Sequence, residues 1–409
     1  MTDRPEPPAG MLVVTIDRLP AWILPAFGCT WAAMPTVDAL AGRGLVLDRL
    51  VAVGDDPLDT LASLAGRPPE AHAGWPLLAA AAARGWSPAV VTDDADFAAR
   101  LPADVAARVV PTAAEPRIAG DAAETNLGRL CAAAVDIGAL PGRRFVWLHA
   151  ASLGQAWDAP VEHRTTYLDP DDPPPPPGAG VPQLHVTAET DPDVLAVLRQ
   201  LFAGQLTLLD ECLGRLLEGL GADDPPRQWT VLLTGVRGLP LGLHGVVGPL
   251  PLAPYGELVQ LPALLVDHQA RMAAQRYGGL LTPADCGATL VELLGTARAA
   301  ADDPRRGRSL GPLLDEWRFE HRDRAVSVTS RGVAVATPAW HLVLPTAADG
   351  EAQPLLFTKP DDFFEACDVA DRVPAVAEEL GQLARLAAAE PRAAWVAPLS
   401  AAARDPESR

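Results

Sequence analysis

The chain has 409 residues, 49% of them hydrophobic, and a formal net charge of −19. This size fits one large α/β domain with a small appendage. The acidity, without any basic block, excludes the charge pattern expected of a nucleic-acid-binding protein. Lys359 is the only lysine. The chain therefore lacks a P-loop, whose lysine contacts phosphates, and its chemistry does not depend on a Schiff base.

The ends and the cysteines indicate a cellular compartment. Residues 1–9 lack the apolar core of a signal peptide and are expected to be flexible. No run approaches the ~20 apolar residues of a membrane span. The five cysteines are scattered, without the paired spacing of a zinc site or a disulfide framework (Cys29, Cys131, Cys212, Cys286, Cys367). We expect a cytoplasmic protein with reduced thiols and no membrane partner.

Strand and helix patterns alternate along the first three quarters of the chain. The apolar run 11–16 stops at Asp17 and Arg18, as a buried parallel strand does at the carboxyl edge of a sheet. Further strands are expected at 89–91, 107–110, 145–149, 229–234 and 262–266, and helices at 75–84, 115–137, 191–219 and 282–294. This alternation predicts a mostly parallel sheet covered by helices on both faces, within a domain spanning 10–321.

Two segments depart from the alternation. The stretch 169–182 contains five consecutive prolines, Pro173 to Pro177, and is expected to form an exposed loop of polyproline type. Short strands separated by Gly or Pro turns begin near residue 322 and predict a small antiparallel subdomain over 322–395, closed by a helix at 373–389. Residues 396–409 are expected to fray.

Six segments, taken in order, resemble motifs of the sulfatases, a family of the alkaline phosphatase superfamily. They lie at 12–67, 145–160, 206–217, 231–245, 281–310 and 356–371. The resemblance covers nearly the whole chain and implies an α/β sandwich of the alkaline phosphatase type. It also implies hydrolysis of sulfate or phosphate esters, with one divalent cation, usually Ca²⁺, and a Cys or Ser nucleophile.

The cation ligands of the family are mostly missing. The resemblance places a tandem Asp after the first strand and an Asp with His or Asn after a later one. Asp17 matches one ligand, but its neighbour is Arg18, and the later pair is Val236 and Arg237. An aliphatic side chain and two guanidinium groups cannot coordinate a cation. We therefore expect no cofactor, and Ca²⁺ or another divalent cation only if the protein is an active hydrolase.

The family nucleophile is also replaced. Its position falls on Asp55 or Asp56, and the catalytic His of the family is lost in the stretch 152–154. His244 matches a His of the family and is the remaining candidate for acid–base work. Asp56 and Thr60 are weak candidates for a substitute nucleophile.

These replacements suggest an exchange of charges. Arg18 and Arg237 would face Asp17 and Asp55 or Asp56, filling the metal position with Arg–Asp pairs, because buried charges must be paired. Arg18→Ala should then lower stability by ~3 kcal/mol or more. Random drift in an exposed, unused cleft is the alternative interpretation.

Three functions follow from this interpretation. The first is a pseudoenzyme that binds a small anionic ligand or a protein partner in a vestigial cleft (Asp17, Arg18, Asp55, Asp56, Arg237, His244). The second is an active hydrolase of sulfuric or phosphoric esters with a divergent site. The third is a structural protein that binds a partner through its proline-rich loop.

Overall fold

A computed structural model describes residues 9–67, 71, 74–222, 229–297, 303–316, 322–346 and 352–404. Its centre is an eight-stranded sheet with the order β10-β2-β9-β7-β1-β5-β3-β4. The strands are β1 (Gly10–Ile16), β2 (Leu45–Val51), β3 (Ser87–Thr92), β4 (Ala106–Val109), β5 (Arg144–Ala150), β7 (Trp229–Gly235), β9 (Gln260–Val266) and β10 (Gln275–Leu281). Neighbours pair in parallel except at β9, which is antiparallel to β7 and β2. The mostly parallel sheet predicted from the sequence is therefore confirmed.

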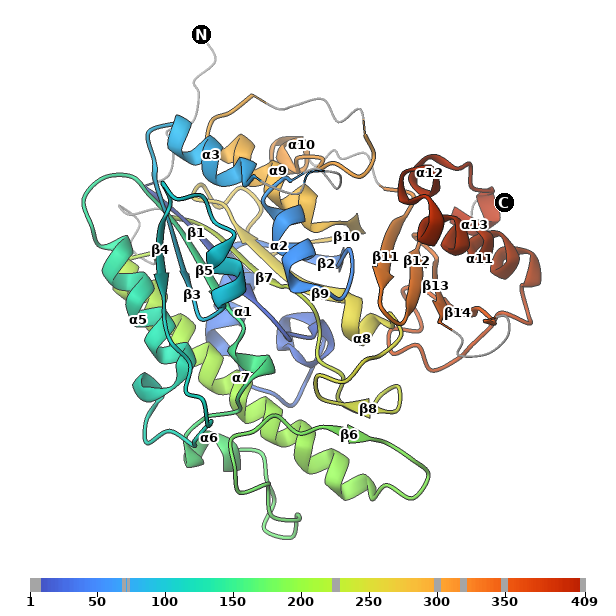
Figure 1. Ribbon diagram of the computed structural model, residues 1–409, viewed down its shortest axis with the longest axis horizontal. Helices are drawn as coiled ribbons and strands as arrows, with labels where there is room; N and C mark the ends of the chain where they lie inside the picture. The colour runs from blue at the N-terminus through green and yellow to red at the C-terminus, as the bar shows by residue number, and fades with distance from the viewer. Residues whose placement is uncertain are drawn as a thin grey trace.

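Helices cover both faces of this sheet (Figure 1). One layer contains α1 (Pro35–Arg43), α5 (Asn126–Gly138) and α7 (Pro192–Leu220), and the other contains α2 (Pro57–Leu64), α3 (Pro76–Ala83) and α9 (Pro283–Leu293). Strand β1 supplies both cores in alternation, because successive side chains point to opposite faces. Leu12, Val14 and Ile16 pack under the first layer, whereas Met11 and Val13 pack under the second.

Shorter elements complete the main domain. They are α4 (Ala95–Ala99), α6 (Val161–Thr165), β6 (Leu184–His185), β8 (Val246–Val247), α8 (Gly256–Val259), α10 (Gly311–Glu316) and the 3₁₀ turns η1 (Ala21–Ile23), η2 (Pro25–Phe27), η3 (Ala122–Glu124) and η4 (Ser152–Gly154). None of the helices in the described ranges is long and apolar enough to cross a membrane. All five cysteines are free thiols.

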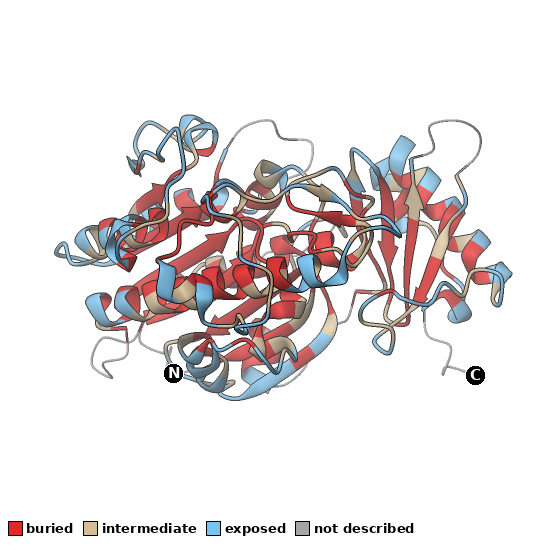
Figure 2. Ribbon diagram, turned by 90° about the horizontal axis from the view of Figure 1, so that it is seen from below, coloured by how far each residue is buried: buried red, intermediate tan, exposed pale blue. Residues whose placement is uncertain are grey.

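The C-terminal subdomain is an antiparallel sheet with one helical face. It contains β11 (Ala325–Thr329), β12 (Gly332–Ala336), β13 (Trp340–Pro345), β14 (Leu355–Thr358), α11 (Pro374–Ala389), α12 (Pro391–Val396) and α13 (Ala401–Arg404). It has a core of its own, visible as the second buried region in Figure 2. It joins the main domain where Val328 donates its N–H to the Val53 carbonyl at 2.9 Å. A Cβ on Gly54 would lie 2.6 Å from the Val328 carbonyl oxygen, so this approach requires glycine.

Several sequence-based boundaries need correction. The helix expected at 115–137 begins only at Asn126, because Pro116 and Gly120 precede it and the Thr125 side chain caps it. Strands β2, β10 and β14 had not been predicted. The tail from 396 was expected to fray, but Leu399 and Ala403 are buried against the subdomain. Residues 1–8 and 405–409 lie outside the described residues.

The proline-rich loop is more firmly attached than an exposed excursion would be. The buried Arg164 guanidinium donates to the carbonyl oxygens of Trp157 at 2.9 Å, Pro176 at 2.7 Å and Gly178 at 3.1 Å. Most of Pro173 to Pro177 is half-buried rather than fully exposed.

Glu365 ties the subdomain to the main domain. One carboxylate oxygen accepts the Gly256 N–H at 2.7 Å, and the other lies 2.5 Å from His341 Nδ1 and 3.0 Å from Lys359 Nζ. Burial alone would raise the pKa of Glu365, but His341 and Lys359 lower it to about 2, from an ordinary 4.5.

This pKa predicts acid sensitivity at the joint. A carboxyl whose pKa is depressed on folding contributes stability above its unfolded pKa, and that contribution is lost as the pH falls from 4.5 toward 2. Urea unfolding should show wild type more stable than Glu365→Gln at about pH 6, with the difference shrinking by about pH 3. A difference independent of pH would contradict this role for Glu365.

Candidate active site

The sequence-predicted site lies at the carboxyl edge of the central strands. Asp17 follows β1 directly, and its N–H donates to the Ala150 carbonyl at the end of β5 at 2.8 Å. On the other side, the Val236 N–H donates to the Ile16 carbonyl at 3.0 Å, which fixes the turn after β7. Ligands of open α/β sheets bind at this edge. The topology therefore brings Asp17 and Arg237 together from positions 220 residues apart.

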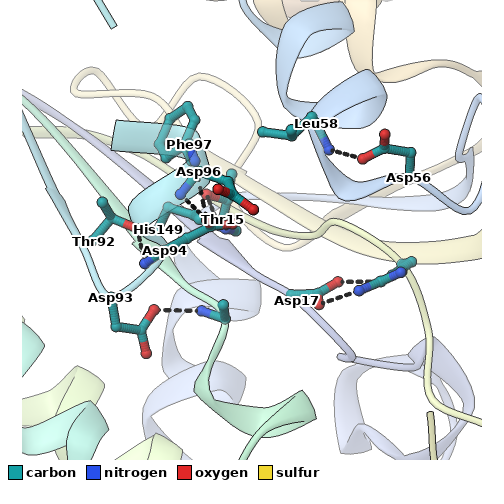
Figure 3. Close-up of polar contacts among 12 residues, drawn as sticks. Thr15, Asp17, Asp56, Leu58, Thr92, Asp93, Asp94, Asp96, Phe97 and His149 are labelled. Atoms are coloured by element: carbon teal, nitrogen blue, oxygen red, sulfur yellow. Dashed lines mark hydrogen bonds and ion pairs between the residues drawn. The ribbon is translucent and has the colours of Figure 1, made fainter. Parts of the chain in front are cut away.

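Arg237 forms a two-pronged ion pair with Asp17. Its Nε lies 2.8 Å from Asp17 Oδ1, and its Nη2 lies 3.0 Å from Oδ2. Figure 3 shows both contacts on the Asp17 carboxylate. The third donor, Nη1, reaches the backbone carbonyl of Asp55 at 2.7 Å. The Asp17 side chain is 5% exposed and that of Arg237 is 21% exposed, so this is a largely desolvated, bidentate pair.

Arg18 is buried beside this pair, and no carboxylate of the described residues lies at ion-pair distance from it. Its Nη1 donates to the Gly238 carbonyl at 3.4 Å, and its Nε is buried and has no hydrogen-bond partner within the same part of the chain. Burial, and then the charge of Arg237, lower the pKa of Arg18 to about 10, although Asp17 and Asp55 oppose the shift. Arg18 therefore stays charged at neutral pH. Gly154 leaves room for it, because a Cβ there would lie 2.9 Å from Arg18 Cγ.

The aspartates at the start of α2 have structural partners. The Asp55 carboxylate accepts hydrogen bonds from the N–H of Ser330 and from its hydroxyl at 2.6 Å, in the turn between β11 and β12. Asp56 caps α2 by accepting the Leu58 N–H at 2.9 Å (Figure 3). The hydroxyl of Thr60 is buried and has no hydrogen-bond partner in the described part of the chain. Burial, together with Asp56, raises the pKa of the neighbouring Asp59 carboxyl.

His244 belongs to a separate contact. Its Nδ1 lies 2.8 Å from Glu257 Oε1, and its ring stacks on Tyr255 with 3.8 Å between centroids. Glu257 is buried and also accepts the N–H groups of His244 and Leu241. A buried carboxylate thus orients the imidazole. None of these hydrogen bonds involves Asp17, Arg18 or Arg237.

Two further polar residues, Asp93 and His149, are buried beside the site. Asp93 is buried, and its carboxylate accepts the Ala151 N–H at 2.7 Å (Figure 3). Burial raises the pKa of Asp93. His149 is fully buried at the end of β5, and its Nδ1 lies 3.0 Å from the Thr15 hydroxyl. Both residues follow apolar runs, which was the available signal.

The side chains around Asp17 do not suit a divalent cation. Both oxygens of Asp17 are engaged by Arg237, and the positive charges of Arg18 and Arg237 would repel a metal ion. Over the described ranges, no group of three or more His, Cys, Asp or Glu side chains is arranged to hold one. Hard cations need several oxygen ligands, and the residues around Asp17 do not provide them.

Comparisons with known proteins identify chains with a similar sequence segment or a similar fold. No family model matches the chain. It is 32% identical over 142 residues to the "Multifunctional alkaline phosphatase superfamily protein PehA" of Trinickia caryophylli, a match covering 32% of this chain and 26% of that protein. The chain thus spans about a quarter of that curated relative's length.

Solved structures align over almost the whole chain. A phosphonate monoester hydrolase of Agrobacterium radiobacter aligns with a TM-score of 0.72 and 17% identity, covering 94% of this chain and 95% of that one. A putative sulfatase from Bacteroides thetaiotaomicron gives a TM-score of 0.67 and 16% identity, covering 98% and 96%. At these identities the likeness concerns the fold alone.

Proposed function

We propose that the chain is a binding pseudoenzyme of the alkaline phosphatase superfamily of ester hydrolases, without metal-dependent ester hydrolysis; the partial match to PehA and the fold shared with a phosphonate monoester hydrolase support the superfamily. The predicted fold class is confirmed. The loss of hydrolysis is our proposal, and one observation carries it: Arg237 occupies both oxygens of the only carboxylate that matches a family metal ligand.

The other site residues support the same proposal. A family nucleophile must be free to attack, whereas the Asp55 carboxylate is held by Ser330 and Asp56 caps a helix. A helix cap and an inter-domain hydrogen bond are structural roles. At the positions that match the family's site, one ion pair, Asp17 with Arg237, and two hydrogen-bonded aspartates therefore stand in place of a metal ligand set and a nucleophile.

Arg18 favours a small oxyanion as the ligand. Its guanidinium is charged, buried and unmatched by a carboxylate at ion-pair distance among the described residues, and its Nε has no partner. A carboxylate or phosphate group satisfies such donors well. A protein partner presenting an acidic side chain would use the same contact.

A panel of esters tests the loss of hydrolysis. Purified protein should release no nitrophenol above buffer from nitrophenyl sulfate, phosphate or phenylphosphonate, with Ca²⁺, Mg²⁺, Mn²⁺ or Zn²⁺ added. Asp17→Asn is the matched control, since it removes the one matching ligand. Turnover in wild type that disappears in Asp17→Asn would overturn the proposal.

The second candidate is an active hydrolase with a divergent site. The observation favouring it is the His244–Glu257 contact, in which a buried carboxylate orients an imidazole as the carboxylate of a Ser–His–Asp triad does. Under this alternative, ester turnover should persist in Asp17→Asn and be lost in His244→Asn. The third candidate is partner binding through the proline-rich loop. None of the contacts described above specifically favours it.

A further inference from the structure

A small cavity lies between the main sheet and the C-terminal sheet, away from Asp17. Its volume is about 20 Å³, and seven residues line it: Arg49, Val51, Val259, Gln260, Ala336, His341 and Lys359. A space of this size holds one water molecule or one monatomic ion. The lining contains an arginine, a lysine, a histidine and an amide, and no acidic side chain.

The hydrogen bonds around the cavity leave N–H donors in excess. Arg49 donates to the carbonyl oxygens of Pro338 and Thr337 at 2.6 and 2.7 Å, which uses two of its five N–H groups. The side-chain amide of Gln260 donates to the Asp48 carbonyl at 3.0 Å. Lys359 Nζ is satisfied by Glu365 and by the carbonyl oxygens of Asp362 and Phe363.

His341 contributes an unpartnered buried nitrogen. Its Nδ1 is engaged by Glu365 at 2.5 Å, and its Nε2 is buried with no hydrogen-bond partner among the described residues. The residue is 5% exposed. A buried polar atom without a partner is costly. In the imidazolium form of the ring, Nε2 carries an N–H that can donate to an anion.

The local charge balance depends on His341. Arg49 and Lys359 carry two positive charges. Two negative charges face them: Glu365, which contacts His341 and Lys359, and Asp362, whose charge favours the protonated form of Lys359. Asp48, the next residue to Arg49, is paired with Arg276. Among the described residues, an imidazolium at His341 is therefore the charge that an anion in the cavity would match.

We propose that this cavity binds one monatomic anion of the size of chloride, held by Arg49 and His341 Nε2 beside the methyl groups of Val51, Val259 and Ala336. The anion would complete the joint between the two sheets. Because Arg49 comes from β2 and His341 from β13, its binding would stabilise the docking of the C-terminal subdomain, which presents Ser330 to Asp55.

Bromide provides a direct test. Crystals of the full chain grown or soaked in sodium bromide should show an anomalous peak within hydrogen-bond distance of Arg49 and His341 Nε2. Density without anomalous signal at that position would identify a water and overturn the proposal.

Thermal unfolding provides an independent test. When chloride replaces methanesulfonate in the buffer at equal ionic strength, the wild-type melting temperature should rise by about 2 °C. Methanesulfonate is too large for the cavity, whereas chloride fits. Arg49→Gln should lose this response, and Arg276→Gln, a neighbouring substitution outside the cavity, should keep it. An equal chloride response in wild type and Arg49→Gln would contradict the site. If Arg49→Gln does not fold, the bromide experiment still decides.

Discussion

Replacing Arg237 by methionine should lower the free energy of unfolding by about 3–5 kcal/mol. The substitution keeps much of the side-chain volume but leaves the nearly buried Asp17 carboxylate without its two charged donors, and the Asp55 carbonyl without its partner. Breaking a buried ion pair from one side costs this much because the remaining charge is desolvated and unpaired. Urea unfolding of the two proteins measures it.

Arg18→Met is the matched control, and it revises the sequence-based expectation. The burial of Arg18 agrees with that expectation, but no carboxylate at ion-pair distance was found for it among the described residues. Removing its charge should therefore change stability by less than about 1 kcal/mol, since the lost bond to Gly238 is offset by relief of desolvation. Adding Asp17→Asn to Arg237→Met should recover much of the loss. Equal losses for the two arginine variants would contradict this assignment.

Replacing Arg322 by methionine should also cost about 3–5 kcal/mol. Its guanidinium contacts both oxygens of Asp285 at 2.5 and 2.7 Å, and the two side chains are 2% and 0% exposed. Asp285 also accepts the Thr282 and Arg308 N–H groups, which fixes the start of α9 and the loop before α10. This cluster links the main domain to the segment that enters the C-terminal subdomain.

An exposed ion pair is the control for this second substitution. Arg108 and Asp136 lie 3.1 Å apart, with side chains 51% and 67% exposed. Arg108→Met should change the free energy of unfolding by less than about 1 kcal/mol, because exposed pairs contribute little. If Arg322→Met proves as mild as Arg108→Met, Asp285 is not desolvated as described.

The fold was largely predictable because its strongest signals are local. The unbroken apolar run of β1 and the long periodic stretch of α7 identify a buried strand and an amphipathic helix by themselves. The sequence of β2 did not, because Asp48 and Arg49 interrupt it at a bulge, and their side chains serve partners on other elements. In β10, two adjacent glycines hid the pattern in the same way.

The sequence predicted the site only as a set of charged residues that stand where the family has metal ligands and a nucleophile. An arginine at the position of a metal ligand indicated a pair with Asp17, and Arg237 makes that pair. The sequence could not separate Arg237 from Arg18, because the difference depends on which guanidinium reaches the carboxylate. It also could not show that Asp55 binds Ser330, 275 residues away, since that contact depends on how the two domains dock.

Bound metal per chain is the most direct test of the central claim, that Arg237 has taken the place of the cation. Protein purified without chelator and dialysed against Ca²⁺, Mg²⁺ or Mn²⁺ should retain far less than one ion per chain by elemental analysis. The triple variant Arg18→Asp, Val236→Asp, Arg237→His restores the family's set of ligand types beside Asp17 and should retain more. Near-stoichiometric metal in wild type, lost in Asp17→Asn, would show that Asp17 serves a cation and would contradict the account.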